Sequence, residues 1–184
     1  MTMTLLATAQ TINQFSLDQI IHNMTEALSQ KIALLQPKEK IAMIGIHTGG
    51  VWIAEKLRAN MKLSIPFGTL NIAYYRDDFS EKGLHPSVIP STLPFDMDES
   101  HIILVDDVIM SGRTIRASLN EIFDYGRPQS VTLCTLVDIP HRDLPIHPDI
   151  TGIRVDLLPN QRIKLTGPDH FSLTVREIAS DVSR

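Results

Sequence analysis

The stretch that decides the fold runs His101-Ile-Ile-Leu-Val-Asp-Asp-Val-Ile-Met-Ser-Gly-Arg-Thr114. We predict an apolar strand from His101 to Val105 that ends at two adjacent carboxylates, Asp106 and Asp107. A short loop with Ser, Gly and Thr then leads into a helix. Ligands of α/β proteins bind at the carboxyl ends of parallel strands, and the amides at a helix start suit a phosphate. The stretch therefore predicts a phosphate-binding site at one edge of a sheet.

The flanking sequence predicts alternating strands and helices. Apolar residues at spacings of three and four indicate a helix over residues 16–35, and Ser16 with Gln19 forms a capping-box start. Such alternation predicts βαβ units and a mostly parallel sheet. The remaining expected strands cover residues 41–46, 68–75 and 130–137, with short pieces near 162–165 and 171–175. The remaining expected helices begin at Val51 and cover residues 115–125, the latter burying Ile115, Leu119, Ile122 and Phe123.

A ribose 5-phosphate explains why two carboxylates stand beside a phosphate cradle. Asp106 and Asp107 can accept hydrogen bonds from the 2- and 3-hydroxyls of the sugar while the loop holds the 5-phosphate. Ser111 and Thr114 offer hydroxyl donors, and Gly112 lets the chain approach the anion closely. The carboxylates also favour the positive charge that develops at the sugar during a displacement at C1. The two common glycine-rich nucleotide loops are absent from the sequence.

This segment resembles the motif with which type I phosphoribosyltransferases bind 5-phosphoribosyl-1-pyrophosphate (PRPP). The resemblance implies their α/β fold, a mostly parallel central sheet flanked by helices. It also implies one domain over residues 1–184, with a small hood formed by the N- and C-terminal segments. The residues expected to bind PRPP are Asp106, Asp107, Val108, Ile109, Met110, Ser111, Gly112, Arg113 and Thr114.

Residues 44–152 are similar to the PyrR family of uracil phosphoribosyltransferases. The similarity rests on Tyr75-Arg-Asp-Asp-Phe-Ser80, Phe123-Asp-Tyr-Gly-Arg-Pro128 and His141-Arg-Asp-Leu-Pro-Ile146. It implies uracil and PRPP as substrates and uridine monophosphate (UMP) and pyrophosphate as products. Many members also regulate pyrimidine genes by binding messenger RNA, and members are usually dimers or tetramers. The resemblance therefore implies a homo-oligomer and leaves RNA as an alternative partner.

A second anion site is expected at His47-Thr48-Gly49-Gly50, where a strand passes into a helix and exposes amides. The resemblance makes this turn the pyrophosphate loop. Many members place Arg where Gly49 stands; glycine removes that charge but permits the unusual backbone torsions that such a loop needs. The alternative is an ordinary turn between a strand and a helix.

Catalytic roles implied by the resemblance fall on Asp106, Asp107 and Arg76. Arg76 would neutralise the leaving pyrophosphate beneath a long loop that excludes water, although an exposed Arg paired with Asp77 or Asp78 explains it equally well. Mg²⁺ is expected to enter with PRPP. Asp106 and Asp107 would be its protein ligands, and substrate oxygens and water would hold most of it.

Base recognition is expected at Val137, Asp138 and Ile139, because backbone amides can match the alternating carbonyl and N–H groups of uracil. Purine-using members of the superfamily typically carry an acid where Met110 stands, and a thioether cannot handle a base proton. The purine alternative loses ground on this point, and an orotate alternative stays open. Competition among free bases would separate the three.

The composition of the chain argues against strong RNA binding. A formal net charge of −4 gives no basic surplus for nucleic acid, and Arg142 is kept while His147 and Ile153 stand where regulatory relatives tend to carry basic residues. RNA regulation is therefore the alternative to an enzyme alone. A single buried cysteine, Cys134, the lack of a signal peptide and the lack of an apolar stretch of ~20 residues indicate a cytoplasmic protein without a membrane partner.

Overall fold

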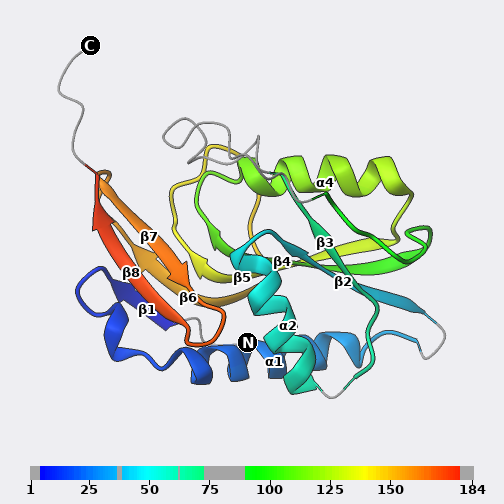
Figure 1. The fold of residues 1–184 in the computed structure, drawn as a ribbon, viewed down its shortest axis with the longest axis horizontal. Coiled ribbons are helices and arrows are strands. Elements are labelled where there is room, and N and C mark those ends of the chain that lie inside the picture. Colours follow the sequence, from blue (N-terminus) through cyan, green and yellow to red (C-terminus); the bar gives the residue numbers. More distant parts are fainter. Residues whose placement is uncertain (1–4, 37–38, 62, 73–89, 179–184) are drawn as a thin grey trace, which may run out of the picture.

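A six-stranded sheet forms the centre of the computed structural model, which describes residues 5–36, 39–61, 63–72 and 90–178 (Figure 1). The strand order is β1-β6-β5-β4-β2-β3, and every neighbouring pair is parallel. The expected fold class, α/β with a mostly parallel central sheet, is confirmed. The strands are β1 (Leu5–Thr8), β2 (Lys40–Ile46), β3 (Phe67–Leu70), β4 (Ser100–Ile109), β5 (Ser130–Asp138) and β6 (Ile150–Asp156).

Helices cover both faces of the sheet, with α1 and α2 on one face and α4 on the other (Figure 1). The Ser16 hydroxyl accepts the Gln19 N–H at 3.3 Å, so the predicted capping residue does start the first helix. A short 3₁₀ helix, η1, precedes it. The helices are η1 (Ile12–Gln14), α1 (Leu17–Ile32), α2 (Gly49–Met61) and α4 (Arg113–Tyr125).

The core has two layers. One layer joins α1 and α2 to the sheet through fully buried side chains such as Ile21, Ile53 and Leu136. The other joins α4 to the opposite face through Leu104 and Ile122. These apolar layers fix where each strand ends, and therefore where the polar groups at the strand ends can meet.

Two further strands, β7 (Gln161–Thr166) and β8 (Ser172–Glu177), form a separate antiparallel pair. Their inward side chains, Ile163, Leu165 and Leu173, join the core layer of α1 and α2. Figure 1 shows this hairpin at the left of the view, whereas β1 lies within the large sheet. A hood built from both chain ends stays a prediction, as does the single domain over residues 1–184.

Several expected boundaries were wrong. β4 continues past the acid pair to Ile109, because β5 extends to Asp138 and keeps pairing with it. Phe123 was expected on the buried face of α4, but it is 44% exposed because the sheet covers the helix along a line centred on Ile115 and Ile122. The strand expected over residues 68–75 ends at Leu70, and residues 73–75 lie outside the described part.

Cys134 is fully buried, as expected, and burial raises the pKa of its thiol to about 12. It is therefore a core side chain. Among the described residues, no helix combines the length and the apolar character that a membrane crossing requires.

Candidate functional site

The acid pair lies near the carboxyl end of β4, on two different faces of the sheet. Ile103 and Val105 belong to the core layer of α1 and α2, so the alternation of a strand places Asp107 on that side and Asp106 on the side of α4. Asp106 is only 4% exposed, and its Oδ1 accepts the Asp107 N–H at 3.0 Å. The prediction that both carboxylates bind ribose hydroxyls is not tested by this geometry.

The loop after β4 has a backbone that only some residues adopt readily. Gly112 stands before the first residue of α4 with φ of 90°, which is the left-handed region that glycine tolerates best. The Ser111 hydroxyl accepts the Arg113 N–H at 3.2 Å. The first turn of α4 contains no acidic residue. Its amides and macrodipole therefore suit an anion, such as the predicted 5-phosphate.

The second half of the predicted second anion loop, Gly49 and Gly50, lies within α2, and His47 and Thr48 form the turn before it. The expected helix start at Val51 was wrong by two residues, since α2 begins at Gly49. The peptide bond between His47 and Thr48 is cis. The His47 N–H donates to the Leu70 carbonyl at 2.8 Å, and burial lowers the pKa of the His47 ring. The loop therefore presents a helix start, which is a feature that anion sites use.

Gly49 has a different role from the expected one. The notable backbone torsion among the described glycines is at Gly112, whereas Gly49 is helical. A Cβ atom built on Gly49 would lie 2.8 Å from the Cβ of Asp107 and closer still to the carboxylate of that residue. Space for Asp107, and not a strained torsion, is what the structure shows at this position.

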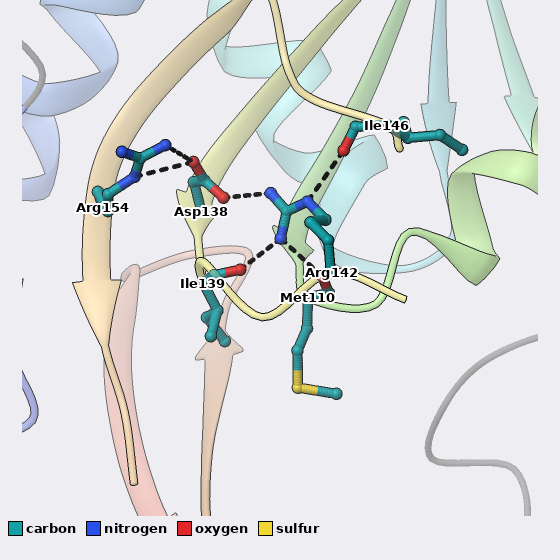
Figure 2. Close-up of polar contacts among 6 residues, drawn as sticks. All are labelled: Met110, Asp138, Ile139, Arg142, Ile146 and Arg154. Carbon is teal, nitrogen blue, oxygen red and sulfur yellow. Dashed lines mark hydrogen bonds and ion pairs between the residues drawn. The ribbon is translucent and has the colours of Figure 1, made fainter. Parts of the chain in front are cut away.

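The predicted base segment is tied down by a buried arginine, Arg142, whose side chain is 10% exposed (Figure 2). Its guanidinium donates to the Met110 carbonyl at 2.6 Å, to the Ile146 carbonyl at 2.9 Å and to the Ile139 carbonyl. It also pairs with the Asp138 carboxylate. One side chain thus joins the end of β5, the loop after β4 and the tail.

Asp138 carries two arginines on one carboxylate. Its Oδ1 pairs with Arg142, and its Oδ2 accepts from Arg154 Nη2 at 2.9 Å and Nε at 3.2 Å. The Asp138 side chain is 2% exposed, whereas that of Arg154 is 48% exposed. This carboxylate is therefore fully engaged within the protein, and only main-chain groups of the residue are left to meet a base.

The main chain of Ile139 is also engaged. Its N–H donates to the Ile109 carbonyl at 2.9 Å, and its carbonyl accepts from the His141 N–H at 2.8 Å as well as from Arg142. A carbonyl oxygen has two lone pairs, so this one is saturated. Base binding at Val137, Asp138 and Ile139 stays a prediction, and it would have to use main-chain groups that these bonds leave open.

Arg142 and Arg154 were not predicted as parts of the site. Arg142 was counted as a cation for RNA, but in the structure its side chain is only 10% exposed and pairs with Asp138. Ile153 was counted as a lost surface cation, yet its side chain is fully buried in β6. Neither residue therefore supports an argument about RNA affinity. Arg142 lies in the stretch His141–Ile146 that carries the family resemblance, but an Arg four positions after an Asp in a Pro-rich tail gives no periodic signal of their pairing.

The remaining predicted features are Arg76 and the ligands of a metal ion. Arg76 and the stretch Tyr75 to Ser80 lie outside the described residues. Within residues 5–36, 39–61, 63–72 and 90–178, no cluster of three or more His, Cys, Asp or Glu side chains could hold a metal ion. A carboxylate at Asp107 beside a helix start fits a cation that arrives with its own oxygen ligands better than one held by the protein alone.

Known proteins are similar to this chain in sequence and in fold. Residues 14–163 match the family model described as "Phosphoribosyl transferase domain". The chain is 54% identical over 165 residues to the bifunctional protein PyrR of Nitrosococcus oceani, covering 89% of this chain and 93% of that protein. It is 53% identical over 142 residues to the PyrR of Pseudomonas aeruginosa, covering 77% and 84%. The chain belongs to the PyrR family.

Solved structures of more distantly related proteins resemble this chain in fold. A hypoxanthine-guanine phosphoribosyltransferase of Bacillus anthracis is 19% identical, with a TM-score of 0.58 and coverage of 79% of this chain and 81% of that one. A hypoxanthine phosphoribosyltransferase of Staphylococcus aureus is 14% identical, with a TM-score of 0.58 and coverage of 79% and 77%. At such identities these structures show the type I phosphoribosyltransferase fold of this PyrR-family chain and leave its substrate open.

Proposed function

We propose that the chain transfers the phosphoribosyl group of PRPP to uracil and yields UMP and pyrophosphate. One observation carries the proposal: the carboxylate of Asp107 lies against Gly49 at the start of α2. The predicted ribose and pyrophosphate sites therefore adjoin, as they do in one PRPP molecule. Membership in the phosphoribosyl transferase domain family supports the reaction class.

The reaction is a displacement at C1 of the ribose. The bond from C1 to the pyrophosphate oxygen breaks with both electrons leaving on oxygen, N1 of uracil forms the new bond to C1, and the N1 proton passes to water or to the departing pyrophosphate. The α4 start, with Gly112, would hold the 5-phosphate, and the α2 start would take the pyrophosphate. The acid pair would stabilise positive charge on the sugar. Mg²⁺ bound with PRPP would supply charge neutralisation for the leaving group, and Asp106 and Asp107 would be its protein ligands.

The choice of uracil is supported by what surrounds the base segment. Met110 carries no ionisable group, and the Asp138 carboxylate is taken by two arginines. No carboxylate of this segment is therefore free to exchange a proton with a purine ring. A base that is recognised by main-chain hydrogen bonds suits this segment. Arg142 would keep the segment, and therefore the bound base, at a fixed position relative to C1.

The test is a coupled assay of pyrophosphate release from PRPP and magnesium, with and without uracil. We expect release that requires uracil and is not supported by hypoxanthine, guanine or orotate. Release with a purine but not with uracil would overturn the assignment. Asp107→Asn and Thr114→Ala are expected to weaken PRPP binding in calorimetry while the circular dichroism spectrum stays unchanged. Unchanged affinity in both variants would place the site elsewhere.

A second function, nucleotide-dependent RNA binding, is favoured by the relatives that are named bifunctional. The resemblance to PyrR proteins points to the leader RNA of pyrimidine genes as the partner. A gel-shift with that RNA should show retardation that depends on UMP and weakens with salt. Catalysis without any retardation at low salt would leave the enzyme as the sole function.

Cellular context completes the proposal. We keep the expected cytoplasmic location and the homo-oligomeric state as predictions, because PRPP and uracil are intracellular metabolites and relatives of this type associate. Sedimentation velocity of the purified chain checks the second point, and a monomer at micromolar concentration would contradict it.

A further inference from the structure

The β7–β8 hairpin forms a sheet of its own beside the six-stranded sheet. A two-stranded hairpin alone is at best marginally stable in water, and it needs packing against other elements. Here that packing comes from Ile163, Leu165 and Leu173, which are buried in the core layer of α1 and α2. The position of the hairpin therefore depends on its side-chain contacts with this layer.

The turn of the hairpin lies close to α2 at Gly167, the residue that follows β7. A Cβ built on Gly167 would lie 2.8 Å from the Cδ1 and Cε1 atoms of Phe171 and 3.0 Å from the Cε3 atom of Trp52. Phe171 comes directly before β8, whereas Trp52 belongs to α2. Both rings are partly buried and pack against the core layer of α1 and α2. Two aromatic rings, one from each element, thus join the hairpin turn to α2 around a residue without a side chain.

Trp52 lies in the first turn of α2, and the main chain of this turn is already held on two sides. A Cβ on Gly45 in β2 would lie 2.6 Å from the Cα of Val51. A Cβ on Gly50 would lie 2.4 Å from the Val105 carbonyl oxygen in β4. The hairpin adds a third contact, through the Trp52 side chain, and this contact comes from a late segment of the chain.

A helix start holds an anion well only when its amides keep a fixed direction. We propose that Trp52 is a positioning residue for the pyrophosphate group of PRPP: its ring joins the hairpin turn to the first turn of α2, so that the docked hairpin fixes the direction of the amides. The inference rests on the proposed function, which places the pyrophosphate at this helix start. Trp52 acts through the main chain of α2, because its ring packs toward Gly167.

Loss of the Trp52 ring should weaken PRPP binding more than base binding. A displacement of about 1 Å can cost about 10²-fold, and a smaller shift of the helix start should cost at least about threefold. Trp52→Leu keeps apolar bulk and is expected to raise the Kd for PRPP by at least that factor. Trp52→Phe keeps an aromatic ring and should recover most of the affinity. The KM for uracil at saturating PRPP should change less, because Arg142 holds the base segment on the other side of the site.

The experiment is a double-mutant cycle on PRPP affinity, measured by calorimetry with magnesium and without uracil on the full chain. Its members are the wild type, Trp52→Leu, Gly167→Ala and the double variant. Gly167→Ala pushes the turn away from Trp52, so it should weaken PRPP binding at least about threefold alone but less than about twofold in the Trp52→Leu background. Equal losses in both backgrounds would overturn the inference. If Gly167→Ala does not fold, Trp52→Leu decides alone, and a wild-type Kd in that variant would overturn the inference.

The emission of Trp52 provides an independent readout, because it is the single tryptophan of the chain. Gly167→Ala should shift the emission of the folded, ligand-free protein to longer wavelength, since the indole gains contact with water. An unshifted spectrum would contradict the contact between the hairpin turn and α2.

A matched control separates position from general destabilisation. Ile122→Val removes one buried carbon from the opposite core layer and should lower the urea midpoint. It should leave the Kd for PRPP and the emission of Trp52 unchanged. A loss of PRPP affinity equal to that of Trp52→Leu would show that destabilisation is the cause and would overturn the positioning role.

The wild type distinguishes this inference from the proposed function. PRPP binding without uracil-dependent pyrophosphate release would contradict the proposed reaction and leave the cycle valid as a test of Trp52. Uracil-dependent release with unaltered PRPP binding in Trp52→Leu would do the reverse. A wild type that binds no PRPP would overturn both.

Discussion

The two sides of the candidate site are built by opposite means. On the side of α2, close contact comes from absent side chains, with Gly49 against Asp107 and Gly50 against the backbone of β4. On the side of β5, contact comes from hydrogen bonds that saturate Asp138, Arg142 and Ile139 (Figure 2). The first side should be sensitive to added bulk, and the second to the loss of a polar partner.

One side of the site, the fixed wall formed by Asp138, Arg142 and Ile139, is held by hydrogen bonds. The other side, the glycine wall formed by Gly49 and Gly50, is shaped by the absence of side chains. The pair of Asp138 and Arg142 is costly to disrupt, because removal of either side chain leaves the other charged and largely desolvated. Gly49 and Gly50 add no side chain of their own at the helix start, although both are buried and Gly49 lies against Asp107. The fixed wall suits recognition of a small base. The glycine wall, at the start of α2, suits an anion that brings its own cation.

Loss of the shared carboxylate is expected to have the largest effect. Asp138→Ala leaves Arg142 buried and unpaired, and breaking a buried pair in this way costs roughly 3–5 kcal/mol. The measurement is the free energy of unfolding in urea. Arg154→Ala is the matched control, because Arg154 is half-exposed and its removal should cost less than about 1 kcal/mol. Similar losses in both variants would show that the fixed wall does not depend on Asp138.

Added bulk at Gly50 is expected to come next. Gly50→Ala drives a Cβ into the Val105 carbonyl and the Asp106 backbone, and neither can rotate away. Overpacking of this kind costs about 1–3 kcal/mol, which urea unfolding would detect. Gly49→Ala should cost less in stability, since the Oδ2 and Cγ of Asp107 can turn aside and only its Cβ, at 2.8 Å, is fixed by the backbone. A greater loss of stability at Gly49 than at Gly50 would contradict the comparison between backbone and side-chain contact.

Much of the fold was predictable from local patterns. The strand and acid pair over residues 101–107 and the glycine before α4 all carry signals that depend on neighbouring residues only. β6 was missed because Gly152 interrupts its apolar alternation, and that glycine is needed where the Cγ2 of Ile20 approaches to 2.6 Å of a Cβ built there. β1 was missed because four residues are too few for a periodic signal.

The site was predictable only in part. Motif residues such as Asp107 and Gly112 could be named from their order in the chain. The partners of Arg142 could not, because three of them are carbonyl oxygens that every residue possesses. Such bonds depend on the three-dimensional course of the tail. The same holds for Gly49, whose neighbour Asp107 is 58 positions away in the sequence.

Gly112 tests whether the other predicted anion site, the start of α4, depends on backbone conformation. Gly112→Ala must adopt a left-handed φ, which costs about 1–2 kcal/mol for an ordinary residue. The space around it is open, since the nearest side-chain atom would be 3.5 Å away, so bulk is not the cause. Gly112→Asn should lose less, because Asn visits this region more readily. Equal unfolding free energies for the Ala and Asn variants would argue against a conformational origin.

Substitution of His47 is expected to have the smallest effect on stability. It tests whether the α2 side of the site is desolvated as well as closely packed. Burial lowers the pKa of its ring below the ordinary value of 6.5. Below pH 6.5 the unfolded chain therefore binds a proton at this residue more readily than the folded chain, and stability falls as the pH falls through that value. Above pH 7 both states are neutral, so the residue contributes no pH dependence. Urea unfolding between pH 7.5 and pH 5.5 should therefore show a steeper loss for the wild type than for His47→Gln. Parallel pH profiles would mean that His47 is as solvated in the folded chain as in the unfolded one, and that packing at this wall is confined to the glycines.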